Sequence, residues 1–349
     1  MAVLARSRAR SEGVAPALAP LFRSLFGDRL PFSLRFWDGS GLGPEDAGAT
    51  VVLRSPLALR RILYSPDEIG FGRAYVTGEL DVEGDLLAAM ESLEDAGADL
   101  RIVPRVWLAT MGRALTMGVL GPPLPPPSEE AHVRGWRHSQ ERDAQAIAHH
   151  YDVGNDFYRL VLGPAMTYSC ARFVHPDDTL EEAQEAKHEL ICAKLGLQPG
   201  MRLLDVGCGW GSLVRHAAAH HGVRAVGITL SAQQQEWGRR AVQEAGLSDR
   251  VEIRRQDYRD LTGDRFDAIS SVGMFEHVGR SRLRAYFDRL HAMLVPGGRL
   301  LNHAISTPGG SDFGRRSFLM RYVFPDGELQ DVGTTLLAMQ ASGFEARDV

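Results

Sequence analysis

The sequence has few cysteines, no long apolar run and no excess of basic residues, and each shortage excludes a class of protein. Its three cysteines, Cys170, Cys192 and Cys208, match neither a zinc pair nor a disulfide framework, so we expect no metal site and a reducing, cytoplasmic environment. No stretch reaches the roughly 18 apolar residues of a membrane-spanning helix, and residues 1–10 lack a signal-peptide core. Because 39 Lys and Arg stand against 44 Asp and Glu, we expect no nucleic-acid partner.

The length of 349 residues predicts two folded domains. A content of 44% hydrophobic and 24% charged residues is typical of a folded globular chain and excludes wholesale disorder. The run GPPLPPP at 121–127 cannot continue a helix or join a sheet, and polar residues follow it. We therefore expect a small α+β domain over residues 1–120, a linker over 121–142 and a larger domain over 143–349.

Short apolar segments predict the elements of the small domain. We expect strands at Phe32–Trp37 and Thr50–Leu53, and helices at Leu57–Leu63 and Glu83–Leu93. The glycine-rich segment Gly70–Gly78 lacks the strand-then-helix frame of a phosphate loop, so we interpret it as turning backbone.

Two segments of this domain combine apolar residues at helical spacing with arginines. They are Leu18–Phe26 and Leu100–Leu120, and the second carries Arg101, Arg105 and Arg113. Either segment could lie on a lipid surface. For the first, packing on its own domain is the favoured interpretation, because most amphipathic helices face a core.

The larger domain alternates short apolar runs with helical stretches, a pattern typical of parallel βαβ units. We expect strands at Arg202–Val206, Ala225–Leu230, Val251–Arg254, Phe266–Val272 and Arg299–Ala304. We expect helices at Ser212–His220, Ala232–Ala245 and Arg282–Met293. The predicted fold class is therefore α/β, a Rossmann-like sheet with flanking helices that binds ligands beyond the carboxyl ends of its strands.

A glycine-rich turn follows the first of these strands. Asp205 precedes Gly207, Gly209 and Gly211, whose spacing G-x-G-x-G differs from the dinucleotide fingerprint G-x-G-x-x-G. A tight strand-to-helix connection would explain such a turn taken alone. Preceded by an aspartate and followed by four more βα-like units, it resembles the S-adenosylmethionine site of class I methyltransferases.

The ends of the next two strands carry polar residues suited to that cofactor. Thr229 and Gln234 could hydrogen-bond the ribose, in place of the acidic residue usually found there, while Ser231 is placed to cap the next helix. Asp257, beside Tyr258, could accept a hydrogen bond from the adenine amino group, and its simpler interpretation is a turn residue.

Several blocks together resemble the cyclopropane-fatty-acid synthase family, which includes bacterial phospholipid enzymes and mycolic acid cyclopropane synthases. These blocks are HHYDVGNDFY at 149–158, MTYSC at 166–170, GCGWG at 207–211, TLSAQQ at 229–234, FEHV at 275–278 and FPDG at 324–327. The resemblance is strong over residues 149–349, and the N-terminal domain is similar to the small domain of the phospholipid-acting members. It implies a methyltransferase that uses S-adenosylmethionine on unsaturated phospholipid acyl chains.

The resemblance also implies a reaction and the residues that perform it. Family members methylate a cis double bond held in a water-excluded slot, and a bound bicarbonate removes a proton from the resulting carbocation as the ring closes. The bicarbonate site carried over by motif comprises Cys170, Glu276, His303 and the backbone amide of Ile305. The cofactor contacts carried over are Tyr168, Ser169, Asp205, Gly207, Gly209, Gly211, Thr229, Gln234, Asp257 and Tyr258. His277 receives no role.

Alternatives within and outside the family stay open. Methylation without ring closure would give a methylene-branched chain. A small-molecule N- or O-methyltransferase would have no use for the block Tyr168–Cys170 or for Glu276, and a non-catalytic lipid-binding protein is a further class. In the family, a segment beyond the equivalent of Val349 carries a tyrosine that completes the bicarbonate site, so the sequence is interpreted as a fragment or a shortened member. We expect peripheral attachment to the inner membrane face, and self-association into a homo-oligomer stays open.

Overall fold

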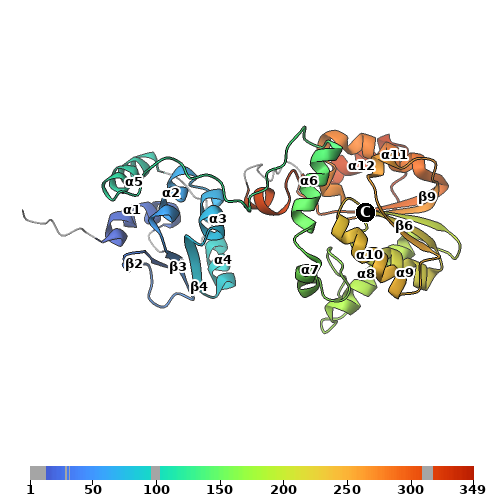
Figure 1. Cartoon of the computed structure of the whole chain (residues 1–349), viewed down its shortest axis with the longest axis horizontal. Helices are drawn as coiled ribbons and strands as arrows, with labels where there is room; N and C mark the ends of the chain where they lie inside the picture. Colours follow the sequence, from blue (N-terminus) through green and yellow to red (C-terminus); the bar gives the residue numbers. More distant parts are fainter. Residues whose placement is uncertain (1–12, 28–29, 31, 96–102, 309–316) are drawn as a thin grey trace, which may run out of the picture. The chain divides into compact units, whose positions relative to one another are not determined.

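The computed structural model describes residues 13–27, 30, 32–95, 103–308 and 317–349 (Figure 1). The chain divides into two compact units, residues 1–130 with 316–318 and residues 131–315 with 319–349. Each unit has its own hydrophobic core. Among the described residues, no helix is long and apolar enough to cross a membrane.

The first unit pairs a four-stranded sheet with five helices among its described residues. The strands are β1 (Ser33–Arg35), β2 (Gly41–Leu42), β3 (Ala49–Leu53) and β4 (Leu80–Gly84), in the order β2-β1-β3-β4. The helices are α1 (Val14–Phe26), α2 (Pro56–Tyr64), α3 (Glu68–Val76), α4 (Leu86–Asp95) and α5 (Pro104–Thr116). The expected mixed α+β character is confirmed, because β1 and β3 run parallel while the other pairs are antiparallel.

One prediction for this unit is wrong, and a second is wrong only in where a helix begins. The segment Gly70–Gly78 lies mostly within α3, where the Asp67 side chain caps the helix by accepting from the amide of Ile69. Gly70 permits close packing rather than a turn, since a Cβ there would lie 1.9 Å from the Ser65 carbonyl oxygen. The helix expected at Glu83–Leu93 is confirmed as α4 except at its start, because Glu83 and Gly84 end β4, where the φ of Gly84 is +95°.

Helix α1 faces the core of the first unit. Its residues Leu18, Leu21, Phe22 and Leu25 are at most 5% exposed, so this face is not available to a lipid surface. The favoured interpretation of the segment is therefore confirmed. Helix α5 packs beside α1, and Arg113 on α5 donates a hydrogen bond to the carbonyl oxygen of Ala17. Arg101 lies outside the described residues.

The second unit contains the predicted parallel sheet. Its strands are β5 (Arg202–Val206), β6 (Arg224–Thr229), β7 (Val251–Arg255), β8 (Phe266–Val272) and β9 (Leu294–His303), in the order β7-β6-β5-β8-β9. Every pairing is parallel. The helices are α6 (Gln140–Tyr151), α7 (Asn155–Leu162), α8 (Leu180–Leu195), α9 (Ser212–His221), α10 (Ala232–Glu244), α11 (Leu283–Met293) and α12 (Val332–Ala341). The predicted α/β class is confirmed.

Helices cover both faces of this sheet because neighbouring strand residues point in opposite directions. On β5, Leu203 packs with α8, α9 and α10, while Leu204 packs with α11 and α12 (Figure 1). The chain proceeds from β5 outward to β7 and then returns to β8 on the other side of β5. A crevice is expected at this reversal, beyond the carboxyl ends of β5 and β8.

Candidate active site

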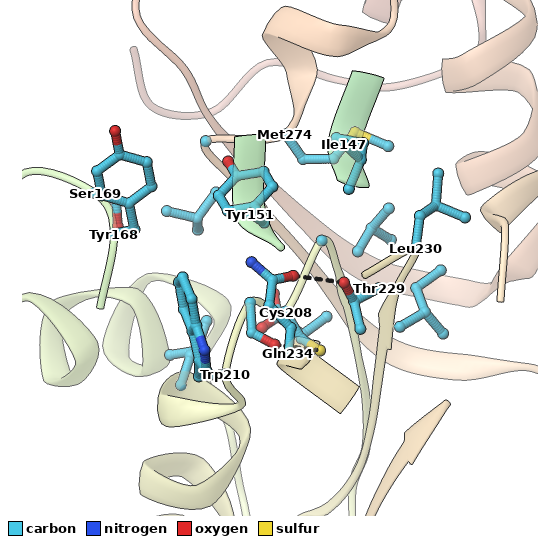
Figure 2. Close-up of a pocket in the computed structure, with 18 of the residues that line it drawn as sticks. Ile147, Tyr151, Tyr168, Ser169, Cys208, Trp210, Thr229, Leu230, Gln234 and Met274 are labelled. Carbon is cyan, nitrogen blue, oxygen red and sulfur yellow. Dashed lines mark hydrogen bonds between the residues drawn. The ribbon is translucent and has the colours of Figure 1, made fainter. Parts of the chain in front are cut away.

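A pocket occupies the carboxyl ends of the strands, at the reversal of strand order. Its wall includes residues at the ends of four strands, namely Val206, Thr229, Gln256 and Val272 (Figure 2). It holds about 1130 Å³ of space, counted out to its open mouth. The pocket therefore lies where a sheet of this type binds its cofactor.

The three glycines of the turn serve different purposes. All have positive φ, at 79° for Gly207, 54° for Gly209 and 81° for Gly211, a conformation that side chains disfavour. A Cβ at Gly207 would lie 2.7 Å from the Cβ of Met274, and one at Gly211 would lie 3.1 Å from Ile253. A Cβ at Gly209 would meet no described atom within 4 Å. Only Gly209 therefore borders open space, where a ligand can approach the backbone.

Asp205 lies in the pocket wall but is only 3% exposed. The Ser270 hydroxyl donates to its Oδ1 over 2.7 Å. Burial raises the pKa of Asp205 to about 6, and the Ser270 hydrogen bond and the Lys187 charge partly oppose this rise. The Asp205 carboxylate therefore lines the pocket in an orientation that the Ser270 hydrogen bond fixes.

Thr229 and Gln234 line the pocket and contact each other. The Thr229 hydroxyl donates to Gln234 Oε1 over 2.6 Å, which fixes the orientation of the amide (Figure 2). Ser231 caps α10 as predicted, since its Oγ accepts from the amide of Gln234 over 3.1 Å. The polar edge at the end of β6 is thus preorganised.

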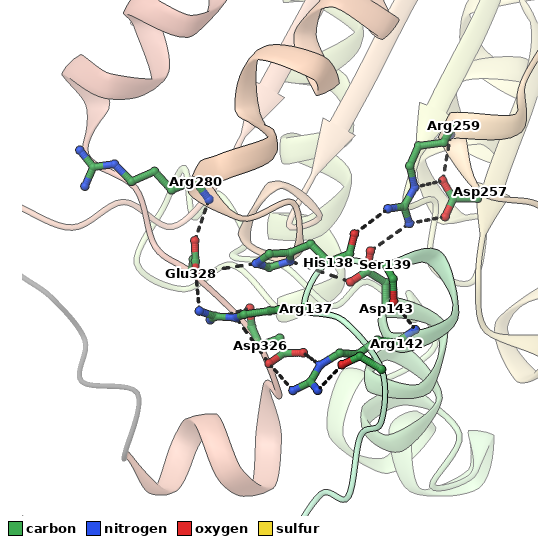
Figure 3. A network of polar contacts seen from close by, with 11 residues as sticks. Arg137, His138, Ser139, Arg142, Asp143, Asp257, Arg259, Arg280, Asp326 and Glu328 are labelled. Carbon is green, nitrogen blue, oxygen red and sulfur yellow. Dashed lines mark hydrogen bonds and ion pairs between the residues drawn. The ribbon is translucent and has the colours of Figure 1, made fainter.

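Asp257 is a turn residue that also lies at the pocket, so its predicted contact with adenine stays a prediction. It lines the pocket, and it also caps a short 3₁₀ helix, Tyr258–Asp260. Its two oxygens accept from the Arg259 side chain, over 2.8 Å at Oδ1 and 2.6 Å at Oδ2 (Figure 3). Tyr258 borders the pocket and packs edge-on against Tyr286.

Aromatic residues form the opposite part of the wall. Tyr168 is 39% exposed, and its ring lies 6.0 Å from the ring of Tyr151 (Figure 2). Tyr151 also contacts Trp210, whose indole nitrogen donates to Asn155 Oδ1 over 2.7 Å. This part of the wall is apolar, and the hydrogen bond to Asn155 fixes the Trp210 ring behind it. Such a wall suits a site that excludes water.

Sequence analysis missed Lys187, a pocket residue on α8. Its Nζ donates to Ser169 Oγ over 2.7 Å, and its neighbour Gln184 donates to the Ser169 carbonyl oxygen over 2.9 Å. Lys187 is 6% exposed, and burial lowers its pKa to about 8. The signal was present: Lys187 stands four residues from both Ala183 and Ile191, on the apolar side of the helix.

His277, to which the sequence assigned no role, also lines the pocket. Burial, together with the smaller effect of nearby histidines, lowers its pKa to about 4. The imidazole is therefore neutral at physiological pH.

The four residues expected to hold bicarbonate lie next to the pocket as two pairs. Cys170 Sγ is 3.7 Å from His303 Nε2, and the amide of Ile305 donates to Glu276 Oε1 over 2.8 Å. The Glu276 charge affects the pKa of His303, so the pairs adjoin, although burial makes the largest contribution and lowers that pKa overall. One expectation needs correction: the Ile305 amide is directed at Glu276 rather than left for an ion.

A network of charged side chains supports the position of Glu276. Arg142 binds Asp326 in a two-pronged ion pair, and Glu328 accepts from the amide of Arg280 over 2.7 Å (Figure 3). The amide of Glu328 donates to the Glu276 carbonyl oxygen over 2.8 Å. The FPDG block is thereby joined to the loop that carries Glu276.

Comparisons with known proteins agree with this geometry. The family model described as mycolic acid cyclopropane synthetase matches residues 138–349. A probable fatty acid methyltransferase of Mycobacterium tuberculosis is 45% identical over 327 residues, which cover 90% of this chain and 76% of that protein. The cyclopropane-fatty-acyl-phospholipid synthase of Escherichia coli is 46% identical over 183 residues, or 52% of this chain and 46% of that protein.

A solved structure is similar as well. The mycolic acid cyclopropane synthase CmaA1, complexed with SAH and CTAB, is 35% identical, with a TM-score of 0.54 over 58% of this chain and 75% of that one. The matched family region contains the sheet, the pocket and both residue pairs described above. The chain therefore belongs to the mycolic acid cyclopropane synthetase family and is an S-adenosylmethionine-dependent methyltransferase.

Proposed function

We propose that the chain methylates a cis double bond in an unsaturated phospholipid acyl chain and closes a cyclopropane ring. The carrying observation is the placement of the pairs Cys170–His303 and Glu276–Ile305 beside the cofactor pocket. Methyl transfer to a heteroatom of a small molecule has no need of this polar group. The name of the Escherichia coli relative supports a phospholipid substrate.

The residues of the pocket have a defined task in this reaction. S-adenosylmethionine, when bound, supplies an electrophilic methyl group, and an alkene is a weak nucleophile. The protein must therefore hold the alkene in line with the methyl group and exclude water from it, because orientation and exclusion of water provide much of the acceleration. Tyr151, Trp210 and Met274 supply an apolar wall for this purpose.

The residues beside the pocket fit a bound bicarbonate in their chemistry. Glu276 Oε2 and His303 Nδ1 are buried and have no hydrogen-bond partner among the described residues. A carboxylate that can accept a proton and an imidazole that can donate one are the groups needed to hold such an anion. Bicarbonate, when bound, would supply the base for the last proton, with Glu276 orienting it.

An enzyme that acts on a lipid of a bilayer needs a surface that contacts the membrane. In this proposal the contact is with the cytoplasmic face. Helix α7 offers one, because Phe157, Leu160 and Val161 are 54%, 85% and 53% exposed. The other side of the same helix packs Tyr158 and Leu162 against Trp210, in the pocket wall. Exposed apolar residues thus adjoin the site where an acyl chain would enter.

Methylation without ring closure is the second candidate. The relative that covers 90% of this chain is named a probable fatty acid methyltransferase, without reference to a cyclopropane. Both reactions add one CH₂ to the lipid, so mass alone does not separate them. Only the methylene-branched product keeps an alkene.

The deciding experiment incubates the protein with methyl-labelled S-adenosylmethionine and vesicles of dioleoyl phosphatidylglycerol. We expect labelled acyl chains whose new carbon lies in a saturated three-membered ring. Labelled acyl chains, released and purified as methyl esters, whose proton NMR spectrum shows alkene CH₂ protons and no ring protons would establish the second candidate. Cofactor binding without any labelled lipid would contradict both and favour a lipid-binding protein.

A further inference from the structure

A cluster of metal-binding side chain types joins α8 to α9, away from the residues assigned above. Glu185, Glu189 and Cys192 follow one another at spacings of four and three on α8, so they share one face of the helix. Three histidines, His216, His220 and His221, stand on the last turns of α9. The two helices pack side by side.

The ligand atoms of this cluster are close together. One atom each of Cys192, His216 and His221 lies within 4.8 Å of the others. Glu189 Oε2 is 3.3 Å from His216 Nε2 and 2.9 Å from His221 Nε2. One thiol and two imidazoles therefore converge, and the Glu189 carboxylate lies against both imidazoles.

We propose that Glu189, Cys192, His216 and His221 form a zinc site. Zinc favours four ligands in a tetrahedron and accepts sulfur, imidazole nitrogen and carboxylate oxygen, at about 2.3, 2.0 and 2.1 Å respectively. Such bonds place neighbouring ligand atoms roughly 3.3–3.8 Å apart.

Packing alone does not account for this arrangement. A fully buried cysteine is ordinary in a core, and Cys192 packs among apolar residues. Burial does not explain why two imidazoles, both bonded to the Glu189 carboxylate, lie beside its sulfur. A second set, Glu185, His216 and His220, shares His216 and lacks a sulfur, so the set containing Cys192 suits zinc better.

The ligands come from two helices, which explains why the sequence showed no zinc motif. With these four residues, every coordination position of the zinc would be filled by the protein, as in structural rather than catalytic zinc sites. The site would tie α9, which begins directly after Gly211, to α8, which holds Ser169 through Gln184 and Lys187. Zinc at this point would fix two walls of the cofactor pocket relative to each other.

The test uses the purified full chain, stripped with a chelator and titrated with zinc or cobalt. We expect one equivalent to bind and the thermal midpoint to rise with zinc concentration, because the metal binds the folded state. Cobalt should give a thiolate-to-metal charge-transfer band. Cys192→Ala should lose that band, and both it and His221→Asn should bind zinc at least about 10-fold more weakly.

His220→Asn is the matched control, since it removes a histidine of the same helix turn from outside the proposed set. We expect it to bind zinc as the parent does. Circular dichroism verifies that each variant is folded. Zinc binding that Cys192→Ala leaves unchanged, or that His220→Asn abolishes while His221→Asn does not, would overturn the proposal.

Discussion

The Lys187 ammonium group donates a hydrogen bond to Ser169 Oγ over 2.7 Å inside the cofactor pocket. Lys187 is 6% exposed, and burial lowers its pKa to about 8. A buried cation with one hydroxyl partner keeps capacity to attract an anion, such as the carboxylate of the cofactor. We therefore expect Lys187 to bind the cofactor and to destabilise the protein when the cofactor is absent.

We predict that Lys187→Met stabilises the protein without cofactor and weakens cofactor binding. The unfolded chain keeps the lysine proton up to the ordinary pKa of 10.5, while the folded chain releases it near 8. The unfolded state therefore holds more protons between these pH values, and the free energy of unfolding rises with pH there. The shift corresponds to at most about 3 kcal/mol.

Thermal midpoints at pH 7.5 and 9.5, with calorimetric cofactor titrations, measure both effects. Lys194→Met, a change on the exposed side of the same helix, serves as the control. We expect Lys187→Met to flatten the rise with pH and Lys194→Met to preserve it. Identical pH profiles for the two variants would show that Lys187 does not carry this charge effect.

A second prediction concerns Gly209, whose open side faces the pocket. Gly209→Val should abolish S-adenosylmethionine binding, because its side chain would enter ligand space. Gly246→Val is the control: Gly246 has a φ of +66°, no described atom lies within 4 Å of a Cβ there, and it follows α10 far along the chain from the turn. Both variants share a strain of about 1–2 kcal/mol. Calorimetry should find binding only in the control, and retained affinity in folded Gly209→Val protein would refute the assignment.

A third prediction concerns Glu276, whose Oε1 accepts from the Ile305 amide. Glu276→Gln should leave cofactor binding nearly intact and reduce turnover by ~10² or more, as loss of a positioned proton acceptor does. Bicarbonate should stimulate enzyme freed of carbon dioxide, and this stimulation should vanish in the variant. Turnover that is indifferent to both changes would exclude a bicarbonate site.

Much of the second unit could be predicted because periodicity and local capping determine it. The strands of the parallel sheet are short apolar runs in the sequence, and Ser231 is a capping residue that indicated the start of α10. The segment Gly70–Gly78 was misread because a glycine that allows close packing looks the same in sequence as one that allows a turn. Only the tertiary contact with Ser65 separates the two.

The candidate site was only partly predictable for a related reason. The glycines, Thr229 and Asp257 stand directly at strand ends, where parallel topology gathers them. Lys187 reaches the pocket from the middle of a helix that precedes the sheet, and its role depends on contact with Ser169. Likewise, the hydrogen bond between Ile305 and Glu276 joins two loops, which no motif encodes.

A fourth prediction concerns the ion pair of Arg142 and Asp326. Burial alone would raise the pKa of Asp326, but hydrogen bonds and charge from Arg142 lower it overall. The carboxylate therefore contributes stability above its ordinary pKa of 3.8, and this contribution is lost as the pH falls through the lowered value. Arg142→Met should lower the free energy of unfolding at pH 7 by about 2 kcal/mol.

Urea unfolding at pH 7 measures this loss. The exposed pair Arg284 and Asp288 gives a control, since Arg284→Met removes an i,i+4 contact and should change stability by less than about 0.5 kcal/mol. Because Glu328, near Asp326, also bonds the backbone of Glu276, turnover should fall further in Arg142→Met than in the control. Equal stability and equal turnover in the two variants would show that the charged network does not hold Glu276 in position.

The last prediction concerns the lipid surface, which we propose to be α7 because the apolar face of α1 is buried. Leu160 is 85% exposed on α7, whose inner side packs into the pocket wall. Leu160→Asp should weaken binding to phosphatidylglycerol vesicles by about 10-fold or more, because burying a leucine contributes roughly 1.5–3 kcal/mol. Leu337→Asp, at a residue 69% exposed on α12, is the control and should bind as the parent does.

Flotation with vesicles in low and high salt measures the affinity. The arginines of α5 should make this affinity salt-sensitive, since charges are screened over about 10 Å at 0.1 M. If both variants bind vesicles equally well, α7 is not the membrane contact.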